Sequence, residues 1–565
     1  MFLNALIMSN QQFSGYLLAI LFLLVSPAIA MNLYSIAPQD PLLSLRSILI
    51  AILVFCLPVV FFRQNLRWYF YLLLPLIALT PVFLFSIIMF GLPPGFGFIA
   101  FVLQTNPRET GEAIGPFIYY FIPVELLYII CYCFAVSKLP EIKLSTRTAS
   151  CISGGCCLIL LSITYYVNGL AYKNVHQLRK SDFLLGHDYP LALLHGVNEA
   201  RIFLKKNNLK QAENFTFRAV KNDTLRQREI YVVIIGESAR YDRWQINGYD
   251  RQTSPRLAAR TNLITYSDVV AGAHYTWVSV PQIITRATPN NYDLQYREKS
   301  ILVAFQEAGF KTVWLSNQSD QDIFWSGSII LHAKTAEVHK FSPTYSPNME
   351  FQNIYDGRLL PLLDSVLRAD EKNLFVVMHT MGNHWEYSKR YPPEFDIFKP
   401  SGWTQAINPP GVKNREAILN SYDNSILYAD HIIDSVINLV DRSGGISTVT
   451  YISDHGEDLF DVRNDEIDFH FRPSAATLQI PLFIWTSEGY KKIFPSKRSH
   501  LEKNMAKKIG TENIFYTQLD LANIGIDAFD STKSFAHPGF VPSQQMYYGD
   551  ERQGRLFSEL PQPLK

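Results

Sequence analysis

The sequence has no cysteine after Cys157, although it has six in all. The chain beyond that point therefore offers neither a disulfide framework nor a zinc–thiolate site. This absence does not fix the redox compartment, because an exported protein can do without disulfides. The sequence also lacks an excess of positive or negative charge. Its formal net charge is +1 at pH 7, so the charge balance gives no reason to expect nucleic acid as a partner.

Long apolar runs, by contrast, crowd the first third of the chain. Each has close to the ~20 residues that cross the hydrocarbon core of a bilayer. The first run could be a signal peptide, but no basic segment precedes it and further runs follow. The sequence therefore predicts an α-helical membrane domain over residues 1–168, with five transmembrane helices near residues 16–33, 47–62, 68–89, 117–136 and 149–166.

Basic residues in the short loops between these runs predict the orientation of the domain, because such loops stay in the cytoplasm. Arg63 and Arg67 lie between the second and third runs, and Lys138, Lys143 and Arg147 lie between the fourth and fifth. With five spans, the N-terminus is then cytoplasmic. Everything after about residue 168 lies outside, which in a bacterium is the periplasm.

Two polar segments belong to the outer side in this arrangement. In the loop 91–116, Thr105, Glu109 and Glu112 could share one face of a short helix. That helix is either a solvated interfacial helix or a polar lip that meets a lipid head group. The linker 169–229 mixes apolar and basic residues at helical spacing, which fits interfacial helices on the membrane surface and a plain linker equally well.

From residue 230 to residue 565, strand-like runs alternate with amphipathic segments. This alternation predicts an α/β domain with a mainly parallel central sheet. The runs are IYVVIIGE (230–237), TVWLSNQ (312–318), NLFVVMHT (373–380), STVTYISDH (447–455) and IPLFIW (480–485).

Side chains that can bind metals follow several of these strands. Functional sites in open α/β sheets gather beyond the carboxyl ends of the strands, so we expect these side chains to converge. Mixed carboxylate and imidazole ligands favour zinc or manganese over magnesium or calcium. The candidates are Glu237, Asn317, His379, His384, Asp454 and His455.

A metal-dependent hydrolase or transferase also needs a nucleophile. Ser238 does not fit the nucleophile elbow G-x-S-x-G, because Arg240 stands in place of the last glycine. Ser238 is therefore interpreted as structural. Thr276, in AGAHYTWVSVP, is the better candidate, since a hydroxyl beside a divalent cation loses its proton more readily.

These residues resemble the phosphoethanolamine transferase family of Gram-negative inner membranes, whose catalytic domain has the alkaline-phosphatase and sulfatase fold. The resemblance covers nearly the whole chain. It is densest in GESARYDRWQINGYDRQTSPRL (236–257), TWVSVP (276–281), HTMGNHWEYSKRYP (379–392), NSYDNSILYADHIIDSVI (420–437) and ISDHGED (452–458).

The resemblance implies a reaction and a set of site residues. The family transfers phosphoethanolamine from phosphatidylethanolamine to a cell-envelope glycan or lipid, through a phosphorylated threonine. Carried over, Thr276 is the acceptor of the phosphoryl group, and a single zinc ion, or less readily manganese, is bound by Glu237, Thr276, Asp454 and His455.

The resemblance also implies substrate contacts. His384 and His470 would line the substrate side of the site, where they could hold phosphate oxygens, serve a second metal or protonate the departing diacylglycerol. Thr105 and Glu109 would hold the ethanolamine end, and a carboxylate is the natural partner of an ammonium group.

Some residues depart from the family pattern, and they bear on the acceptor. The soluble domain lacks the disulfides of typical lipid A modifiers, Phe101 stands where an asparagine is expected, and His470 is not followed by glycine. The chain thus fits a cysteine-poor branch of the family that serves lipopolysaccharide core sugars or periplasmic glucans, and lipid A is the other acceptor that the resemblance allows.

Three other functions compete with this one. A sulfatase shares the fold, but VSVPQIITR does not match the setting in which a Cys or Ser becomes formylglycine. A phosphoglycerol transferase that uses phosphatidylglycerol has the same layout and also uses a threonine. A non-catalytic, membrane-tethered binding protein is the third, and keeping four convergent ligands argues against it.

Overall fold

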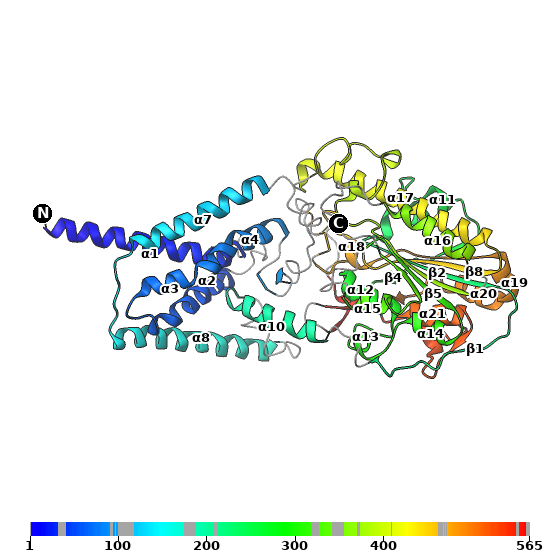
Figure 1. Ribbon diagram of the computed structural model, residues 1–565, viewed down its shortest axis with the longest axis horizontal. Coiled ribbons are helices and arrows are strands. Elements are labelled where there is room, and N and C mark those ends of the chain that lie inside the picture. The colour runs from blue at the N-terminus through cyan, green and yellow to red at the C-terminus, as the bar shows by residue number, and fades with distance from the viewer. Residues whose placement is uncertain are drawn as a thin grey trace. The chain divides into compact units, whose positions relative to one another are not determined.

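The computed structural model divides into two units: a helical unit that ends at Lys205 and an α/β unit from Lys206 onward. Figure 1 shows the first as a group of helices and the second as a sheet covered by helices. The structure describes residues 2–31, 41–90, 94–95, 98–99, 118–174, 188–206, 212–318, 327–341, 355–369, 373–407, 410–461, 467, 469–470, 472–549 and 553–560.

An apolar helix lies over each of the five predicted membrane runs. Two helices, Phe121–Lys138 and Thr146–Ile163, are long and apolar enough to cross a membrane, and α3 with α4 makes a third if the pair, bent by 46°, is one span. Gly15–Ala30 and Ser47–Val60 are shorter, so the described residues do not confirm five spans. The helices of this unit are α1 (Phe2–Ala30), α2 (Pro41–Cys56), α3 (Leu66–Leu72), α4 (Leu74–Phe90), α7 (Ile118–Lys138), α8 (Thr146–Asn174) and α10 (Leu191–Lys206).

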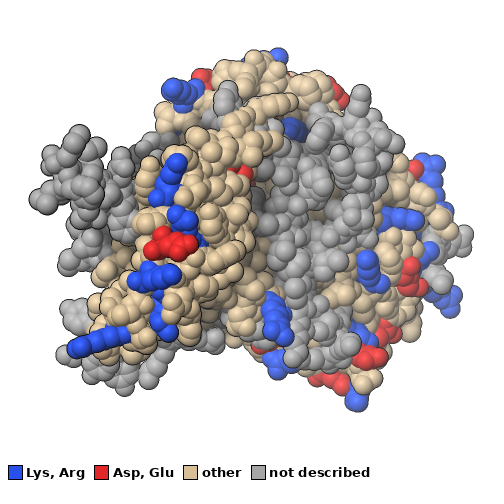
Figure 2. All heavy atoms as spheres, turned by 60° about the vertical axis from the view of Figure 1, so that its left-hand side comes forward, with Lys and Arg blue, Asp and Glu red and all other residues tan. Residues whose placement is uncertain are grey.

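The two basic loops of the helical unit lie side by side. The backbone N–H of Leu144 donates to the carbonyl of Arg63 at 2.8 Å, and the guanidinium of Arg67 donates to the carbonyl of Leu139. Figure 2 shows Lys and Arg side chains gathered on this part of the unit. The two loops therefore lie at the same end of the helices, which agrees with the prediction from their basic residues that both lie on the same side of the membrane.

Part of the predicted linker is helical and belongs to the helical unit. Helix α10 packs Leu193 against the core of that unit and exposes Leu194 and Val197 on its other side. Exposed apolar residues beside basic ones are typical of a helix that lies on a membrane surface.

The α/β unit is built on a seven-stranded mixed sheet in the order β3-β9-β8-β2-β7-β5-β6. The strands from β8 to β6 are parallel, whereas β9 runs antiparallel to both of its neighbours. The prediction of a mainly parallel sheet thus describes only the block from β8 to β6. The strands are β2 (Glu229–Gly236), β3 (Leu263–Thr265), β5 (Lys311–Ser316), β6 (Val338–Lys340), β7 (Leu374–His379), β8 (Ile446–Ser453) and β9 (Leu482–Thr486).

Helices cover both faces of this sheet (Figure 1). Alternate residues of β2 and β7 enter opposite cores, as the two-residue period of a strand requires. One core takes in α12 (Thr276–Ile284), α14 (Ile301–Glu307), α15 (Gly327–Ala333), α18 (Ala475–Leu478), α19 (Glu488–Ile493), α20 (Pro495–Lys503) and α21 (Asn513–Leu521). The other takes in α11 (Pro255–Ala258), α16 (Leu359–Ala369) and α17 (Arg415–Arg442).

Smaller elements complete the unit. Helix α13 covers Leu294–Arg297. Three short strand pairs are β1 (Val220–Lys221) with β11 (Ile524–Gly525), β4 (Val269–Val270) with β10 (Ile509–Gly510), and β12 (Met546–Tyr548) with β13 (Gly554–Leu556).

Candidate metal centre and active site

The centre of the site lies where β2 and β8 end side by side. These strands are parallel, and their last paired residues are Gly236 and Ser453. Glu237 and Asp454 follow directly, so the sheet itself brings the two carboxylates together. The chain leaves β2 by a left-handed turn at Ser238, whose φ is 56°.

Three buried side chains form a ligand cluster here: Glu237, Asp454 and His455. One ligand atom of each lies within 4.8 Å of the other two. The hydroxyl of Thr276 completes the group, at 3.1 and 3.2 Å from the carboxylate oxygens of Glu237 and 3.2 Å from Nε2 of His455. Thr276 is the first residue of α12, where the helix dipole favours negative charge.

The electrostatics of the cluster suit a divalent cation. Without one, burial and the neighbouring Glu237 raise the pKa of Asp454 to about 8. Burial would lower the pKa of His455, but Asp454 and Glu237 raise it to about 10. Oδ2 of Asp454 is buried and accepts no hydrogen bond from the residues that the structure describes. Two adjacent carboxylates, one with an unused oxygen, need a positive charge between them.

The tautomer of His455 fits the same interpretation. Nδ1 of His455 is 2.8 Å from the carbonyl of Gly456, to which it donates, so Nε2 faces the cluster and offers its lone pair once a bound cation displaces its proton. A histidine ligand whose other nitrogen donates to a carbonyl is the usual arrangement at metal sites. The four residues present thus offer the oxygen and nitrogen donors that zinc prefers.

Ser238 orients both carboxylate ligands. Its hydroxyl donates to Oε1 of Glu237 at 2.9 Å, and its backbone N–H donates to Oδ1 of Asp454 at 3.0 Å. Tyr422 stabilises the turn at Ser238, because its hydroxyl donates to the carbonyl of Ser238 at 2.6 Å. Only the position of Ser238, directly after a strand and a glutamate, could have pointed to this double role.

Gln318 is a second residue that sequence reasoning missed. Its side-chain amide donates to Oε2 of Glu237 and to the carbonyl of Thr380, each at 3.1 Å. The neighbouring Asn317, which was expected to point toward the metal, donates to Asp356 instead, at 2.8 Å. Asp356 in turn accepts from the backbone of the loop after β7, so Asn317 helps to hold that loop.

Two histidines lie next to the ligand cluster. The ring centroid of His470 is 4.6 Å from that of His455 and 6.4 Å from that of His384. Nδ1 of His470 is 3.3 Å from a carboxylate oxygen of Glu457, and Nδ1 of His384 is 2.6 Å from the carbonyl of Trp385. Burial lowers the pKa of both imidazoles, that of His470 to about 3, so both are neutral in this state.

One further predicted ligand, His379, does not reach the ligand cluster. His379 ends β7, but its buried ring packs against Trp314 at 5.9 Å between centroids and is not part of the ligand cluster. Thr105 and Glu109 lie outside the described residues.

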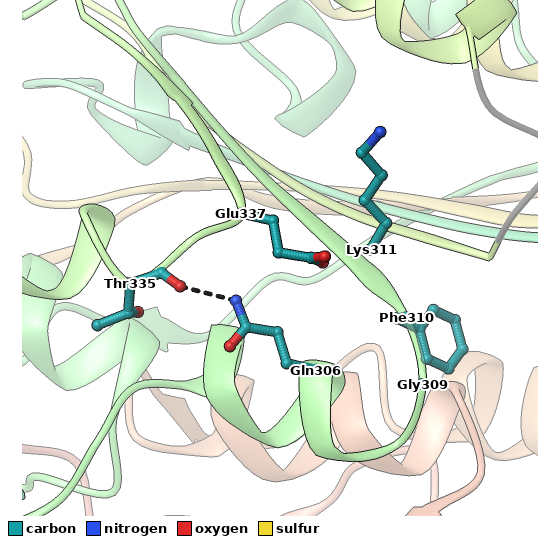
Figure 3. A pocket seen from close by; sticks show the side chains of 6 residues that line it. All are labelled: Gln306, Gly309, Phe310, Lys311, Thr335 and Glu337. Carbon is teal, nitrogen blue, oxygen red and sulfur yellow. Dashed lines mark hydrogen bonds between the residues drawn. The ribbon is translucent and has the colours of Figure 1, made fainter.

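A depression of ≈ 480 Å³ lies at the far end of the sheet (Figure 3). It is lined by Gln306, Gly309, Phe310, Lys311, Thr335 and Glu337. Gln306 donates to the carbonyl of Thr335, as the dashed line in Figure 3 shows. Because Lys311 begins β5, this hollow lies at the opposite end of the strand from Gln318 and has no part in the ligand cluster.

Comparisons with known proteins agree with this arrangement. The sequence profile of the sulfatase family matches residues 229–524. Phosphoethanolamine transferase EptC of Escherichia coli O18:K1:H7 is 28% identical over 357 residues, and phosphoethanolamine transferase EptA of Escherichia coli K12 is 28% identical over 309 residues. These matches cover 61% and 53% of this chain. The chain spans only 59% of the length of EptC and 54% of that of EptA.

Solved structures extend the comparison to the fold. The C-terminal periplasmic domain of EptC from Escherichia coli, in complex with Zn, is 25% identical with a TM-score of 0.54, over 61% of this chain and 96% of that one. The integral membrane protein EptA from Neisseria meningitidis has a TM-score of 0.71 over 92% of this chain and 97% of its own. This protein and EptA from Neisseria meningitidis are 20% identical, a level that supports a shared fold only.

Proposed function

Since the chain belongs to the sulfatase family, we propose that it is a zinc-dependent phosphoethanolamine transferase whose donor is phosphatidylethanolamine. The observation that carries this proposal is the position of Thr276. Its hydroxyl lies within 3.2 Å of both Glu237 and His455, at the start of a helix. A hydroxyl held among metal-type ligands is the nucleophile that a two-step phosphoryl transfer needs. The relatives named as phosphoethanolamine transferases support the same reaction.

In the first step, Oγ1 of Thr276 attacks the phosphorus and the bond from phosphorus to the diacylglycerol oxygen breaks. Thr276 gives up its hydroxyl proton, and the departing diacylglycerol takes one up. Glu237 accepts a hydrogen bond from that hydroxyl, and the neutral imidazoles of His384 and His470 lie close enough to the cluster to relay the proton. A zinc ion bound by Glu237, Asp454 and His455 would neutralise phosphate charge and favour the alkoxide of Thr276.

In the second step, an acceptor hydroxyl or sugar phosphate attacks the phosphorus on Thr276. The new bond forms in line with the bond from phosphorus to Oγ1, which breaks, and Oγ1 takes up the proton released by the acceptor hydroxyl or, for an ionised phosphate acceptor, a proton from solvent. The first step leaves Thr276 modified for the second step, and the second step restores Thr276 for the first. The proposed mechanism is therefore a ping-pong mechanism. Thr105 and Glu109 are proposed to hold the ethanolamine end of the donor.

The chain is proposed to work in a bacterial inner membrane. Helices α7 and α8, which are long and apolar enough to cross a membrane, support a membrane anchor. In this proposal residues 1–168 form five spans with a cytoplasmic N-terminus, residues 169–229 form interfacial linker helices, and residues 230–565 form a periplasmic catalytic domain.

The proposed acceptor is the lipopolysaccharide core or lipid A, with a periplasmic glucan as the further choice. Transfer to a phosphate group of the cell envelope adds an ammonium group, which lowers the net negative charge of the envelope and weakens the binding of cationic antimicrobial peptides. A deletion strain should therefore be more sensitive to such peptides, and unchanged sensitivity would count against this consequence.

The direct test is mass spectrometry of the peptide that contains Thr276, after the purified full-length protein has met phosphatidylethanolamine. We expect a phosphoethanolamine adduct on Thr276 and release of diacylglycerol. Thr276→Ser keeps a hydroxyl and should still form an adduct, whereas Thr276→Ala should form none.

Two results would redirect the proposal. An adduct from phosphatidylglycerol but not from phosphatidylethanolamine would make the protein a phosphoglycerol transferase. No adduct from either lipid, in a protein shown to contain zinc and in the presence or absence of acceptor, would reject Thr276 as the nucleophile.

A further inference from the structure

Gln318 joins the ligand cluster to the end of a neighbouring strand. Its half-buried side-chain amide donates to Oε2 of Glu237 and to the carbonyl of Thr380, each at 3.1 Å. These two hydrogen bonds use both hydrogens of the amide group. The two steps proposed above assign no part to Gln318, so any effect of its amide on the reaction has to pass through Glu237.

The carboxylate of Glu237 is held by one donor on each oxygen. The hydroxyl of Ser238 donates to Oε1 at 2.9 Å, and the amide of Gln318 donates to Oε2 at 3.1 Å. Oγ1 of Thr276 lies at nearly the same distance from both oxygens, 3.2 Å from Oε1 and 3.1 Å from Oε2. The two donors thus fix a carboxylate whose two oxygens both face the proposed nucleophile.

The glutamate side chain cannot fix this orientation by itself. Its terminal torsion is broad and roughly two-fold, so the carboxylate turns easily unless hydrogen bonds hold it. The hydroxyl of Thr276 cannot hold Glu237 throughout the reaction, because it gives up its proton in the first step. Ser238 alone holds only Oε1. The amide of Gln318 is therefore needed to keep Oε2 in place.

The strand order explains how Gln318 reaches Glu237. Strand β7 lies between β2 and β5, and Ile235, His379 and Ser316 form one row across the three strands. Glu237 and Gln318 each follow two residues after their member of this row. Neighbouring strands are about 4.8 Å apart, so about 10 Å separates the ends of β2 and β5. The long side chains of a glutamate and a glutamine together span that gap, and the hydrogen bond to the chain after β7 supports the amide midway.

We propose that Gln318 is a positioning residue: together with Ser238, it holds the carboxylate of Glu237 in the orientation that binds zinc and faces Thr276. This inference rests on the proposed function and extends the site to a residue outside the ligand set. Because Gln318 acts through Glu237, its loss weakens zinc binding and slows attack by Thr276 without removing a ligand.

The first measurement is the zinc affinity of the purified full-length protein, by competition with a chelator of known affinity. Gln318→Met keeps the length of the side chain and removes both donors, so it should lower the affinity roughly 10- to 100-fold. Gln306→Met is the matched control, because the Gln306 amide also makes two hydrogen bonds, to the Thr312 hydroxyl and to the carbonyl of Thr335 (Figure 3). Both variants lose the same kind of stabilising contact, but only Gln318→Met should lose zinc affinity.

A double-mutant cycle then separates positioning from a general loss of stability. Ser238→Ala and Gln318→Met release the same carboxylate, so the second change should cost less once the first has been made. The double variant should therefore lose less zinc affinity than the product of the two single losses. Ser238→Ala combined with Gln306→Met should give that product within roughly twofold, because the two sites share no partner.

The rate of adduct formation on Thr276 is the second readout. With zinc saturating, Gln318→Met should form the phosphoethanolamine adduct more slowly, while the phosphatidylethanolamine concentration that gives half the maximal rate stays unchanged. A role in binding the lipid would raise that concentration instead and would overturn the inference.

The remaining outcomes distinguish the inference from the proposed function. A wild-type protein that binds zinc and forms the adduct, beside Gln318→Met with the same zinc affinity, would overturn the inference and leave the proposed function standing. Losses that simply multiply in the Ser238→Ala and Gln318→Met pair would do the same, since the two donors would then act independently. A wild-type protein that binds no zinc and forms no adduct would reject the proposed function and the inference together.

Discussion

Gly382 packs directly on the backbone of Glu237. A Cβ atom on Gly382 would lie 2.8 Å from both the backbone nitrogen and the backbone oxygen of Glu237, closer than real Cβ contacts allow. The next residue, Asn383, donates its N–H to the carbonyl of Glu237 at 2.9 Å. The loop after β7 thus holds the end of β2 in place, and it brings His384 to the same site.

Gly382→Ala should therefore displace Glu237 and reduce zinc retention, because neither backbone can move aside cheaply. Gly382 also has a φ of 45°, which costs a residue with a Cβ about 1–2 kcal/mol. Gly309→Ala is the matched control: its φ is 87°, but a Cβ there would meet nothing within 4 Å. Zinc content by elemental mass spectrometry should fall in the first variant alone, and equal zinc in both would contradict the close packing.

Asp454→Asn should abolish tight zinc binding without unfolding the protein. The amide has the shape of the carboxylate, and its oxygen can still accept from Ser238 and His455. Without metal the Asp454 carboxyl has a pKa of about 8 and is mostly protonated at neutral pH, so the neutral amide replaces a neutral group and the metal-free variant should melt no lower than the metal-free wild type. We expect the zinc affinity to fall by more than the roughly 10- to 100-fold that is typical when a residue that only hydrogen-bonds to a metal ligand is replaced.

The control for Asp454→Asn is Glu512→Gln, which changes a carboxyl group elsewhere in the same unit, where Ser543 donates to it. This variant should keep its zinc. Tight zinc binding in Asp454→Asn, measured by competition with a chelator of known affinity, would remove Asp454 from the ligand set.

Ser238→Ala should weaken zinc binding about 10- to 100-fold, because it removes the hydroxyl that orients Glu237. The backbone N–H that donates to Asp454 remains, so the effect should stay below that of Asp454→Asn. Ser543→Ala is the control, because it removes a hydroxyl that donates to the carboxylate of Glu512 elsewhere in the same unit and should leave zinc binding unchanged. A zinc titration in which Ser238→Ala equals the wild type would limit Ser238 to its backbone role.

Tyr422→Phe should lower the stability of the α/β unit by about 1–3 kcal/mol. The lost hydroxyl donates to the carbonyl of Ser238 and accepts from the N–H of Arg240, and both groups would be left buried without it. Tyr387→Phe is the control, since the buried Tyr387 hydroxyl makes no hydrogen bond and its ring packs on Tyr422. In thermal unfolding, only Tyr422→Phe should show a clearly lower midpoint.

The sequence predicted the ligand cluster because strand ends can be read from apolar runs. Glu237 and Asp454 each follow an uninterrupted buried strand, and parallel neighbours end at the same edge. The apolar pattern of the two strands is therefore enough to predict that Glu237 and Asp454 lie close together.

The same apolar pattern did not predict which side chain after β5 reaches the ligand cluster. Asn317 and Gln318 are adjacent, yet Asn317 reaches Asp356 and Gln318 reaches Glu237. Successive side chains on extended backbone point to opposite sides, so an uncertainty of one residue in a strand end reverses the assignment. The direction of β9 was missed for a different reason: the apolar content of a strand is the same whichever way it runs.

The register of β2 against β8 also limits how the chain can change in length. Because Gly236 pairs with Ser453, the spacing between each strand and its ligand is fixed to the residue. Deleting one residue within β2 or β8 would turn the carboxylate of Glu237 or Asp454 to the other side of the sheet, although both residues would still be present in the sequence. Insertions and deletions in these two strands should therefore be as damaging as substitution of the ligands, whereas loops remote from the ligand cluster should tolerate them.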